Sequence, residues 1–284
     1  MPADLQAFFL PADGGRIGQR FCLFHPAQGS QMRGSVLYVH PFAEEMNKSR
    51  RMAALQARAL AQAGYDVLQL DLLGCGDSSG DFGDATWQDW VSDVVQGARW
   101  LFSQKRSNSC APEHSAMWLW GLRAGCLVAT QAARQLDVKC HFLFWQPPST
   151  GKPLWQQFLR LKVAGQMLGG GEKGAMEAMR LQLKNGTPVE VAGYQIAPGL
   201  ALGLEEAMLT PPVDLPEDAR VIWLEMSARE DAEPSPVSTK TISVWQQSGF
   251  EVASAMATGP AFWQTAEIED APVLIARTTA AMCL

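Results

Sequence analysis

The sequence predicts an α/β fold: one domain with a mostly parallel sheet and helices on both of its faces. Short apolar runs alternate with longer stretches whose apolar residues recur at helical spacing. The short runs are apolar along their whole length, which is typical of strands buried on both faces of a parallel sheet. A chain of 284 residues is also long enough for one large domain that carries an insertion.

Composition narrows the class of protein. Apolar residues make up 47% and charged residues 18%, as in a soluble globular chain. The formal net charge is −6 and no run rich in lysine and arginine stands out, so nucleic acid is not an expected partner. No apolar run reaches the ~18 residues of a membrane span, and the first residues do not resemble a signal peptide.

The 6 cysteines form no CxxC pair, and most lie in or beside apolar runs. This usage indicates reduced, buried thiols rather than a disulfide framework or a zinc site. We therefore expect a cytoplasmic protein with no metal and no cofactor.

The strands are predicted from β-branched and aromatic runs bounded by turn residues. Residues 6–10 and 19–25 are expected to form an antiparallel edge ahead of the parallel sheet. The remaining expected strands are residues 34–40, 65–71, 116–120, 138–145, 220–226 and 250–256.

The helices are predicted from apolar positions that return every three or four residues. Met52, Leu55 and Ala59 recur in this way, Gly64 supplies a stop, and Ser49 is a candidate N-cap. The charged residues 44–51 are expected to be mostly a solvated loop or local ion pairs. The expected helices are residues 49–64, 87–104, 124–135, 154–167, 203–209, 238–247 and one within 271–283.

The regular alternation breaks between residues 147 and 215, where glycine and proline are frequent. We expect residues 1–146 and 216–284 to form the core. Residues 147–215 are expected to form a helical lid over the carboxyl ends of the strands, where open parallel sheets bind ligands.

Three loops that follow expected strands carry motifs. His40-Pro41-Phe42 follows the strand at 34–40, the run DLLGCGDSSG begins at Asp71, and GLRAG surrounds Arg123. They resemble, in order, the oxyanion loop, the D-x-x-G-x-G-x-S loop and the G-x-S-x-G nucleophile turn of α/β hydrolases. The resemblance implies the α/β-hydrolase fold, with a sheet of about eight strands and a lid.

The residues that perform catalysis in that superfamily are missing. Arg123 stands where the nucleophile is expected, and a guanidinium has no usable lone pair for attack. All 4 histidines precede residue 142, so the loop at 257–263 lacks the general base. Asp231 lies in the loop expected to supply the acid, but a carboxylate with no imidazole to orient has no triad role.

Longer blocks carry a closer resemblance. They are LYVHPFAEEMNKSRRMAALQARALA, VLQLDLLGCGDSSGDFGDATWQDW, WLWGLRAG, and the stretch from QPP to YQIAPGLALGLEEAML. With these blocks the chain is similar to the exosortase A system-associated hydrolase 2 family over nearly its full length. The resemblance implies a hydrolase linked to the bacterial exosortase, PEP-CTERM protein-sorting and exopolysaccharide system, without a defined substrate.

Arg123 has two interpretations. Its fork of donors can anchor a carboxylate, phosphate or sugar acid under the lid. Alternatively, it forms an internal ion pair with Glu44, Glu45 or Asp231. Such a buried pair is weak evidence for stability, so it does not by itself explain the arginine. An open cavity beside Arg123 would favour the first interpretation.

The other candidates follow from position. By the superfamily pattern, the backbone N–H groups of Ala124 and Phe42 form the oxyanion site, and His40 belongs to the same loop. Glu45 is the candidate base for activating water. A further set of aromatic residues is expected either in the core or lining an apolar pocket: Trp155, Phe262 and Trp263.

Two functions remain open on these observations. The first is hydrolysis of an ester or thioester with a non-standard site. The second is a catalytically inactive pseudo-hydrolase that binds an anionic small molecule or a partner protein.

Overall fold

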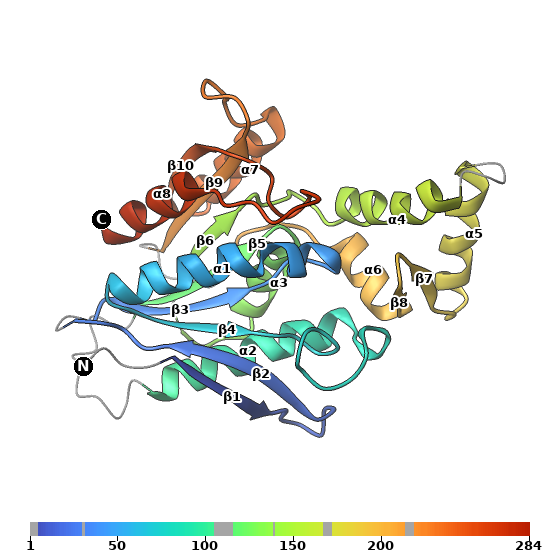
Figure 1. Ribbon diagram of the computed structural model, residues 1–284, viewed down its shortest axis with the longest axis horizontal. Coiled ribbons are helices and arrows are strands. Elements are labelled where there is room, and N and C mark those ends of the chain that lie inside the picture. Colours follow the sequence, from blue (N-terminus) through green and yellow to red (C-terminus); the bar gives the residue numbers. More distant parts are fainter. Residues whose placement is uncertain (1–4, 30–31, 105–115, 139, 167–171, 214–218) are drawn as a thin grey trace.

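The computed structural model describes residues 5–29, 32–104, 116–138, 140–166, 172–213 and 219–284. At its centre lies an eight-stranded sheet in the order β1-β2-β4-β3-β5-β6-β9-β10 (Figure 1). β1 and β2 run antiparallel to their neighbours, and the other pairs are parallel. The predicted mostly parallel sheet with an antiparallel edge is confirmed.

The strand bounds follow the predictions closely. They are β1 (Gln6–Pro11), β2 (Gln19–His25), β3 (Gly34–Val39), β4 (Tyr65–Leu70), β5 (Met117–Leu122), β6 (Cys140–Trp145), β9 (Arg220–Ser227) and β10 (Glu251–Thr258). Every residue of β3, β5 and β6 is buried, which is the physical reason that these strands read as continuous apolar runs.

Helices cover both faces of the sheet (Figure 1). α1 (Glu44–Gln62) and α8 (Pro272–Cys283) pack against each other on one face. α2 (Trp87–Gln104), α3 (Ala124–Ala133) and α7 (Pro236–Gln247) contribute to the core on the other. Each face has its own apolar cluster, one containing Met52 and Trp120 and the other containing Trp90 and Trp245.

α1 begins five residues earlier than its apolar pattern suggests. Glu44 to Ser49 were predicted as a charged loop, but they form the first turns of the helix. Ser49 is not the N-cap; its hydroxyl donates to the backbone carbonyls of Glu45 and Met46 inside the helix. Ala43 occupies the N-cap position instead. The prediction was wrong because a serine before an apolar run also suits an interior position where its hydroxyl bonds the preceding turn.

The segment between β6 and β9 projects from the carboxyl end of the parallel strands (Figure 1). It contains α4 (Lys152–Gln166), α5 (Glu172–Lys184), the hairpin of β7 (Val189–Val191) and β8 (Tyr194–Ile196), and α6 (Pro198–Glu206). α4 matches the predicted helix at 154–167, whereas α6 begins five residues before the predicted helix at 203–209 and shares only residues 203–206 with it. α5 and the hairpin were not predicted. α6 packs against both α2 and α4, so this segment is attached to the core.

Candidate active site

The turn from β5 into α3 has a strained backbone. Arg123, the N-cap of α3, has φ 53° and ψ −119°, a region that residues with a Cβ rarely occupy. Glycines on both sides permit the close packing that this turn requires. A Cβ on Gly121 would meet the backbone of Cys126, and one on Gly125 would meet the carbonyl oxygen of Val39.

The turn from β3 into α1 repeats this conformation. Ala43 has φ 51° and ψ −126°, close to the angles of Arg123. Both residues are helix N-caps, so α1 and α3 present their first N–H groups near the carboxyl end of the sheet. The partial positive charge of two helix starts favours an acidic side chain or a bound oxygen there.

The side chain of Arg123 forms an ion pair with Glu45 on α1. Arg123 Nη2 lies 2.9 Å from Glu45 Oε1, and Arg123 Nε lies 3.2 and 3.3 Å from the two carboxylate oxygens. Nη2 also donates to Gln157 Oε1 on α4 at 3.0 Å. The two charged side chains are only 13% and 12% exposed. Of the partners left open by the sequence, the structure selects Glu45.

A cavity of about 210 Å³ opens beside this pair. Its polar lining consists of Glu44, Glu45, Lys48, Arg123, Gln157 and Gln264. Its apolar lining consists of Phe42, Leu154, Phe158, Leu161 and Trp263. The ion pair and the open cavity therefore coexist, and Arg123 Nη1 makes no hydrogen bond to any residue that the structure describes.

Among the charged residues that line the cavity, Glu44 has a shifted pKa. Burial raises the pKa of its carboxyl group; its own backbone N–H lowers it, and the neighbouring Glu45 raises it further. The atom Glu44 Oε2 is buried and has no hydrogen-bond partner. Glu44 was named from the sequence only as a candidate partner of Arg123.

Trp263 contributes the wall of the cavity from the loop after β10. The Arg123 guanidinium carbon lies 5.7 Å from the centroid of its ring, within cation–π range. Trp263 is 4% exposed, and its indole Nε1 has no hydrogen-bond partner. The loop that lacks a histidine thus supplies an aromatic ring to the cavity wall.

His40 is part of the loop scaffold. Its Nδ1 lies 2.8 Å from the carbonyl oxygen of Pro41, and the Leu72 N–H donates to Nε2 at 3.3 Å. Burial lowers the pKa of His40 below its ordinary value, so the ring is neutral at pH 7. Phe42 lines the cavity with its ring, and the adjacent Ala124 is buried at the first position of α3.

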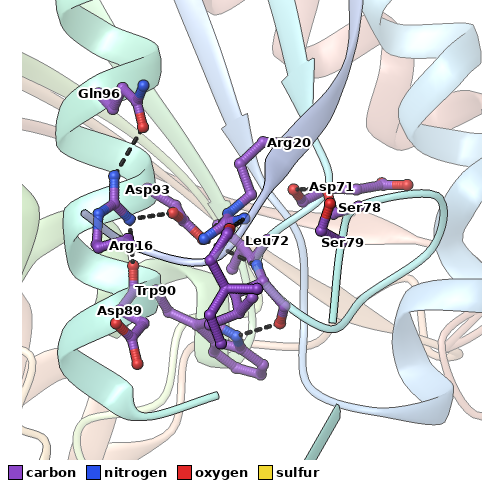
Figure 2. A network of polar contacts seen from close by, with 12 residues as sticks. Arg16, Arg20, Asp71, Leu72, Ser78, Ser79, Asp89, Trp90, Asp93 and Gln96 are labelled. Carbon is purple, nitrogen blue, oxygen red and sulfur yellow. Dashed lines mark hydrogen bonds and ion pairs between the residues drawn. The ribbon is translucent and has the colours of Figure 1, made fainter. Parts of the chain in front are cut away.

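A polar network holds the loop after β4 against α2 (Figure 2). Asp93 on α2 is fully buried between Arg16 and Arg20, and its Oδ2 lies 2.7 Å from Arg20 Nε. The Leu73 N–H donates to the same Asp93 oxygen at 2.8 Å. The indole of Trp90 donates to the Leu73 carbonyl at 3.1 Å, so α2 holds both backbone groups of Leu73.

The other candidate residues lie apart from the cavity. Asp231 is exposed in the loop after β9 and is not among the cavity residues. Trp155 is buried beneath a separate hollow between α4, α5 and α6. Phe262 is fully buried, with its ring centroid 6.1 Å from that of Trp145. Cys126 is also buried, which raises the pKa of its thiol far above the ordinary value, so it is a packed residue and not a nucleophile.

Within the described residues, no group of three or more histidine, cysteine, aspartate or glutamate side chains is arranged to hold a metal ion. No helix in that part of the chain is long and apolar enough to cross a membrane.

The strand order, the strained turn after β5 and the segment between β6 and β9 define an α/β-hydrolase fold. Est1E from Butyrivibrio proteoclasticus, solved with ferulic acid, aligns at TM-score 0.62 and 12% identity over 97% of this chain and 98% of that one. A carboxyl esterase from Bacillus coagulans aligns at TM-score 0.62 and 12% identity over 99% and 97%. A monoglyceride lipase variant from Saccharomyces cerevisiae aligns at 0.61 and 14% over 98% and 94%.

These structures have hydrolase names, and at such low identity the likeness establishes the fold of this chain. No family model and no curated protein matches the sequence. The predicted α/β-hydrolase fold is confirmed.

Proposed function

We propose that this protein is a hydrolase that cleaves an ester or thioester bond of a small acyl compound in the cavity beside Arg123. The observation that carries the proposal is the lining of that cavity. It combines the guanidinium of Arg123, whose Nη1 has no hydrogen bond within the described residues, with the acidic side chains of Glu44 and Glu45, next to two helix starts. Esterases and a lipase with the same fold support the reaction class.

The reaction requires direct attack by water. The described lining contains no serine, threonine, cysteine or histidine, so it offers no side chain for a covalent intermediate of the Ser-His-Asp type. Arg123 binds the carbonyl oxygen or an acidic group of the substrate and stabilises the negative charge that develops during attack. The apolar residues Phe158 and Leu161 receive the acyl chain.

The second candidate is a pseudo-hydrolase that binds an anionic small molecule or a partner protein without turnover. The Arg123–Glu45 ion pair favours it, because this pair fills the position of the missing nucleophile. The two candidates share the cavity and differ in whether a bond is broken.

One experiment separates the two candidates. Purified protein is mixed with p-nitrophenyl acetate, p-nitrophenyl butyrate and S-acyl thioesters, beside the variant Arg123→Ala. Turnover that falls at least tenfold in the variant supports the hydrolase. No turnover, combined with butyrate binding in calorimetry that Arg123→Ala abolishes, supports the pseudo-hydrolase. Turnover that is equal in both proteins contradicts the assignment of Arg123.

The wider assignments are also proposals. The sequence blocks around Arg123 and residues 40–64 support a link to the exosortase and PEP-CTERM system, and the composition supports a cytoplasmic location. Leu154, Gln157 and Phe158 of α4 line the cavity, which supports a lid role for residues 147–215 over a core of residues 1–146 and 216–284.

A further inference from the structure

β10 forms one edge of the eight-stranded sheet (Figure 1), and within the described part of the chain its only strand partner is β9. The N–H groups of Glu251 and Gly259 donate to carbonyl oxygens in residues 219–227, at 3.0 and 2.9 Å. Because backbone groups alternate in direction along a strand, the even-numbered residues from Val252 to Thr258 direct their N–H and C=O groups away from β9. The outer side of β10 is therefore a row of unpaired donors and acceptors.

This outer side lacks the features that usually protect a sheet edge. Between Val252 and Thr258 there is no proline and no charged residue, and the register with β9 continues without a bulge. Ala253 and Ser254 point to opposite faces of the sheet, and both are exposed. β1 at the other edge is shorter and ends at Pro11. Another strand can therefore add to β10 more readily than to β1.

The two helices that pack against β10 carry few charges. α7 and α8 each contain one charged residue, Lys240 and Arg277. Both helices expose valines: Val237 and Val244 on α7 are 59% and 41% exposed, and Val273 on α8 is 39% exposed. Val237 and Val244 lie two helical turns apart and share one face. Depletion of charge beside exposed apolar side chains is typical of the central part of a protein interface.

We propose that this protein forms a homodimer in which β10 pairs antiparallel with β10 of a second copy. The twofold axis stands perpendicular to the sheet, so the two sheets join into one continuous sheet. α7 then lies beside α7 of the second copy, and α8 beside α8. Each copy uses its edge once, so the assembly closes at two copies. The inference is independent of the proposed activity.

The register follows from the residues that direct their backbone groups outward. Centring the strand pair on Ala255 makes even-numbered residues face each other, and Ser254 then pairs with Met256 of the second copy. At the intervening positions the Cα atoms of facing residues are about 4.5 Å apart. These positions hold Ala255 at the axis and Ala253 opposite Ala257. The small side chains permit the close approach that this pairing requires.

Charge complementarity favours a second copy as the partner. Glu251 is the one charged residue of β10, and the antiparallel register places the two Glu251 side chains at opposite ends of the strand pair. α7 connects the end of β9 to the start of β10, so Lys240 in its first half lies toward the end of β10 at Thr258. The register brings Glu251 of the second copy to that same end, where it meets a charge of opposite sign.

The size of this edge is also suited to a dimer. Stable interfaces bury about 1,200–2,000 Å², with about 20–30 residues from each side, so one pair of strands is too small. β10, α7 and α8 contain 8, 12 and 12 residues, which together are enough for an interface of that size. The exposed valines of the helices therefore belong to the proposed interface.

Sedimentation velocity of the purified native chain tests the assembly, and we expect a dimer with a Kd below about 10 μM. Ser254→Pro removes an outward N–H and no bond to β9, so the chain should fold while Kd rises about 100-fold or more. Ala253→Lys places a charge at a close pair and should weaken the dimer to a similar extent. Thermal unfolding verifies that both variants are folded.

Ala7→Lys is the matched control, because it makes the same change at an exposed alanine of the opposite edge strand. Its Kd should stay within about twofold of the native value. Ala255→Cys tests the register without weakening the pairing. Facing Cα atoms about 4.5 Å apart lie within reach of a disulfide, so mild oxidation should give a covalent dimer on a non-reducing gel. Ala7→Cys should give none.

The outcomes decide between this interface and others. Loss of the dimer in Ser254→Pro and Ala253→Lys, together with the Ala255→Cys cross-link, supports the proposal. A native chain that stays monomeric at about 100 μM overturns it. A dimer that both strand variants leave intact, or that Ala7→Lys disrupts, also overturns it, because the contact then lies elsewhere. Ester turnover does not enter this test, so a failure of the proposed activity leaves the dimer standing.

Discussion

At the scale of single residues, the ion pair between Arg123 and Glu45 explains how an arginine is accommodated at a strained, half-buried turn. The guanidinium is held by three contacts to one carboxylate and by one to Gln157. A buried pair adds little to stability compared with apolar residues of the same size, but removing one partner leaves the other charge uncompensated.

Arg123→Met should therefore destabilise the protein by about 2–4 kcal/mol, because Glu45 stays in place without its partner. The double variant Arg123→Met with Glu45→Gln should recover more than half of that loss. Urea unfolding monitored by tryptophan fluorescence gives both values. A double variant no more stable than Arg123→Met alone would contradict the charge argument.

Arg51→Met is the matched control for this measurement. Arg51 lies on the same helix as Glu45 and pairs with Asp270, but the two side chains are 56% and 40% exposed. Exposed pairs contribute about 0–1 kcal/mol, so this variant should change the free energy of unfolding by less than 1 kcal/mol.

The sequence identified Arg123 and Trp263 as cavity residues but could not choose the partner of Arg123. Glu44 and Glu45 are adjacent in the sequence, and which of them faces the turn depends on the start of α1. That start could not be read because Ala43, which lacks a capping side chain, occupies the N-cap position. Gln157 carried no signal at all, since it is an amide in a segment without a motif.

At the scale of elements, the turn between β5 and α3 depends on two close approaches of backbone to backbone. Gly125 is the tighter constraint, because a side chain there would meet the carbonyl of Val39 on the neighbouring strand. The first turn of α3 can therefore reach the carboxyl end of the sheet only with glycine at this position.

Gly125→Ala should destabilise the protein by at least about 3 kcal/mol, because either α3 or β3 must move to admit the methyl group. Gly174→Ala is the control: it lies on α5 with open space around it and should be neutral or stabilise by up to about 1 kcal/mol. Thermal unfolding of both variants tests the contrast. Equal melting temperatures would show that the turn relaxes freely.

The network around Asp93 is the second constraint at this scale. Asp93→Asn keeps an acceptor for the Leu73 N–H but leaves Arg20 buried without a compensating charge. We expect a loss of about 3–5 kcal/mol in the free energy of unfolding. Asp89→Asn, one turn earlier on α2, removes only a cap contact to Thr86 and should cost about 1 kcal/mol. A smaller loss for Asp93→Asn than for Asp89→Asn would contradict this account of the network.

The elements that the sequence failed to predict lie in the segment between β6 and β9. Each strand of the β7–β8 hairpin has three residues, too few for an alternating pattern. Its turn uses Ala192 and Gly193 with φ 50° and 84°, where the usual signal is asparagine followed by glycine. In the core the strands were predictable because burial on both faces imposes long apolar runs.

At the scale of the whole molecule, two histidines in the core region link stability to pH. Burial lowers the pKa of both His40 and His25 below the ordinary value of 6.5. The unfolded chain therefore binds a proton at a higher pH than the folded chain does. The stability that these neutral rings contribute is complete above pH 6.5 and is lost as pH falls from 6.5 through the lowered pKa.

The native protein should accordingly lose stability as pH falls from 7.5 to 5.5, by up to about 1.4 kcal/mol per pH unit for each histidine within its window. His40→Gln should show a shallower loss than the native protein, because one of the two groups is gone. Urea unfolding at five pH values measures both slopes. Glu44 and Asp93, whose pKa values are raised by burial, act in the opposite direction in both proteins and cancel in the comparison. Identical slopes would exclude His40 as a contributor.

The strained turn at Arg123 has a consequence for reading enzyme function from shape. Its φ and ψ are imposed by the packing of α3 against β3 and β5, so the turn persists whether or not the residue on it can attack a substrate. The backbone conformation of this turn is determined by how the sheet and α3 pack. It does not show whether the residue on the turn takes part in a reaction. By its backbone this chain lies beside esterases and a lipase, although the residue on the turn is an arginine.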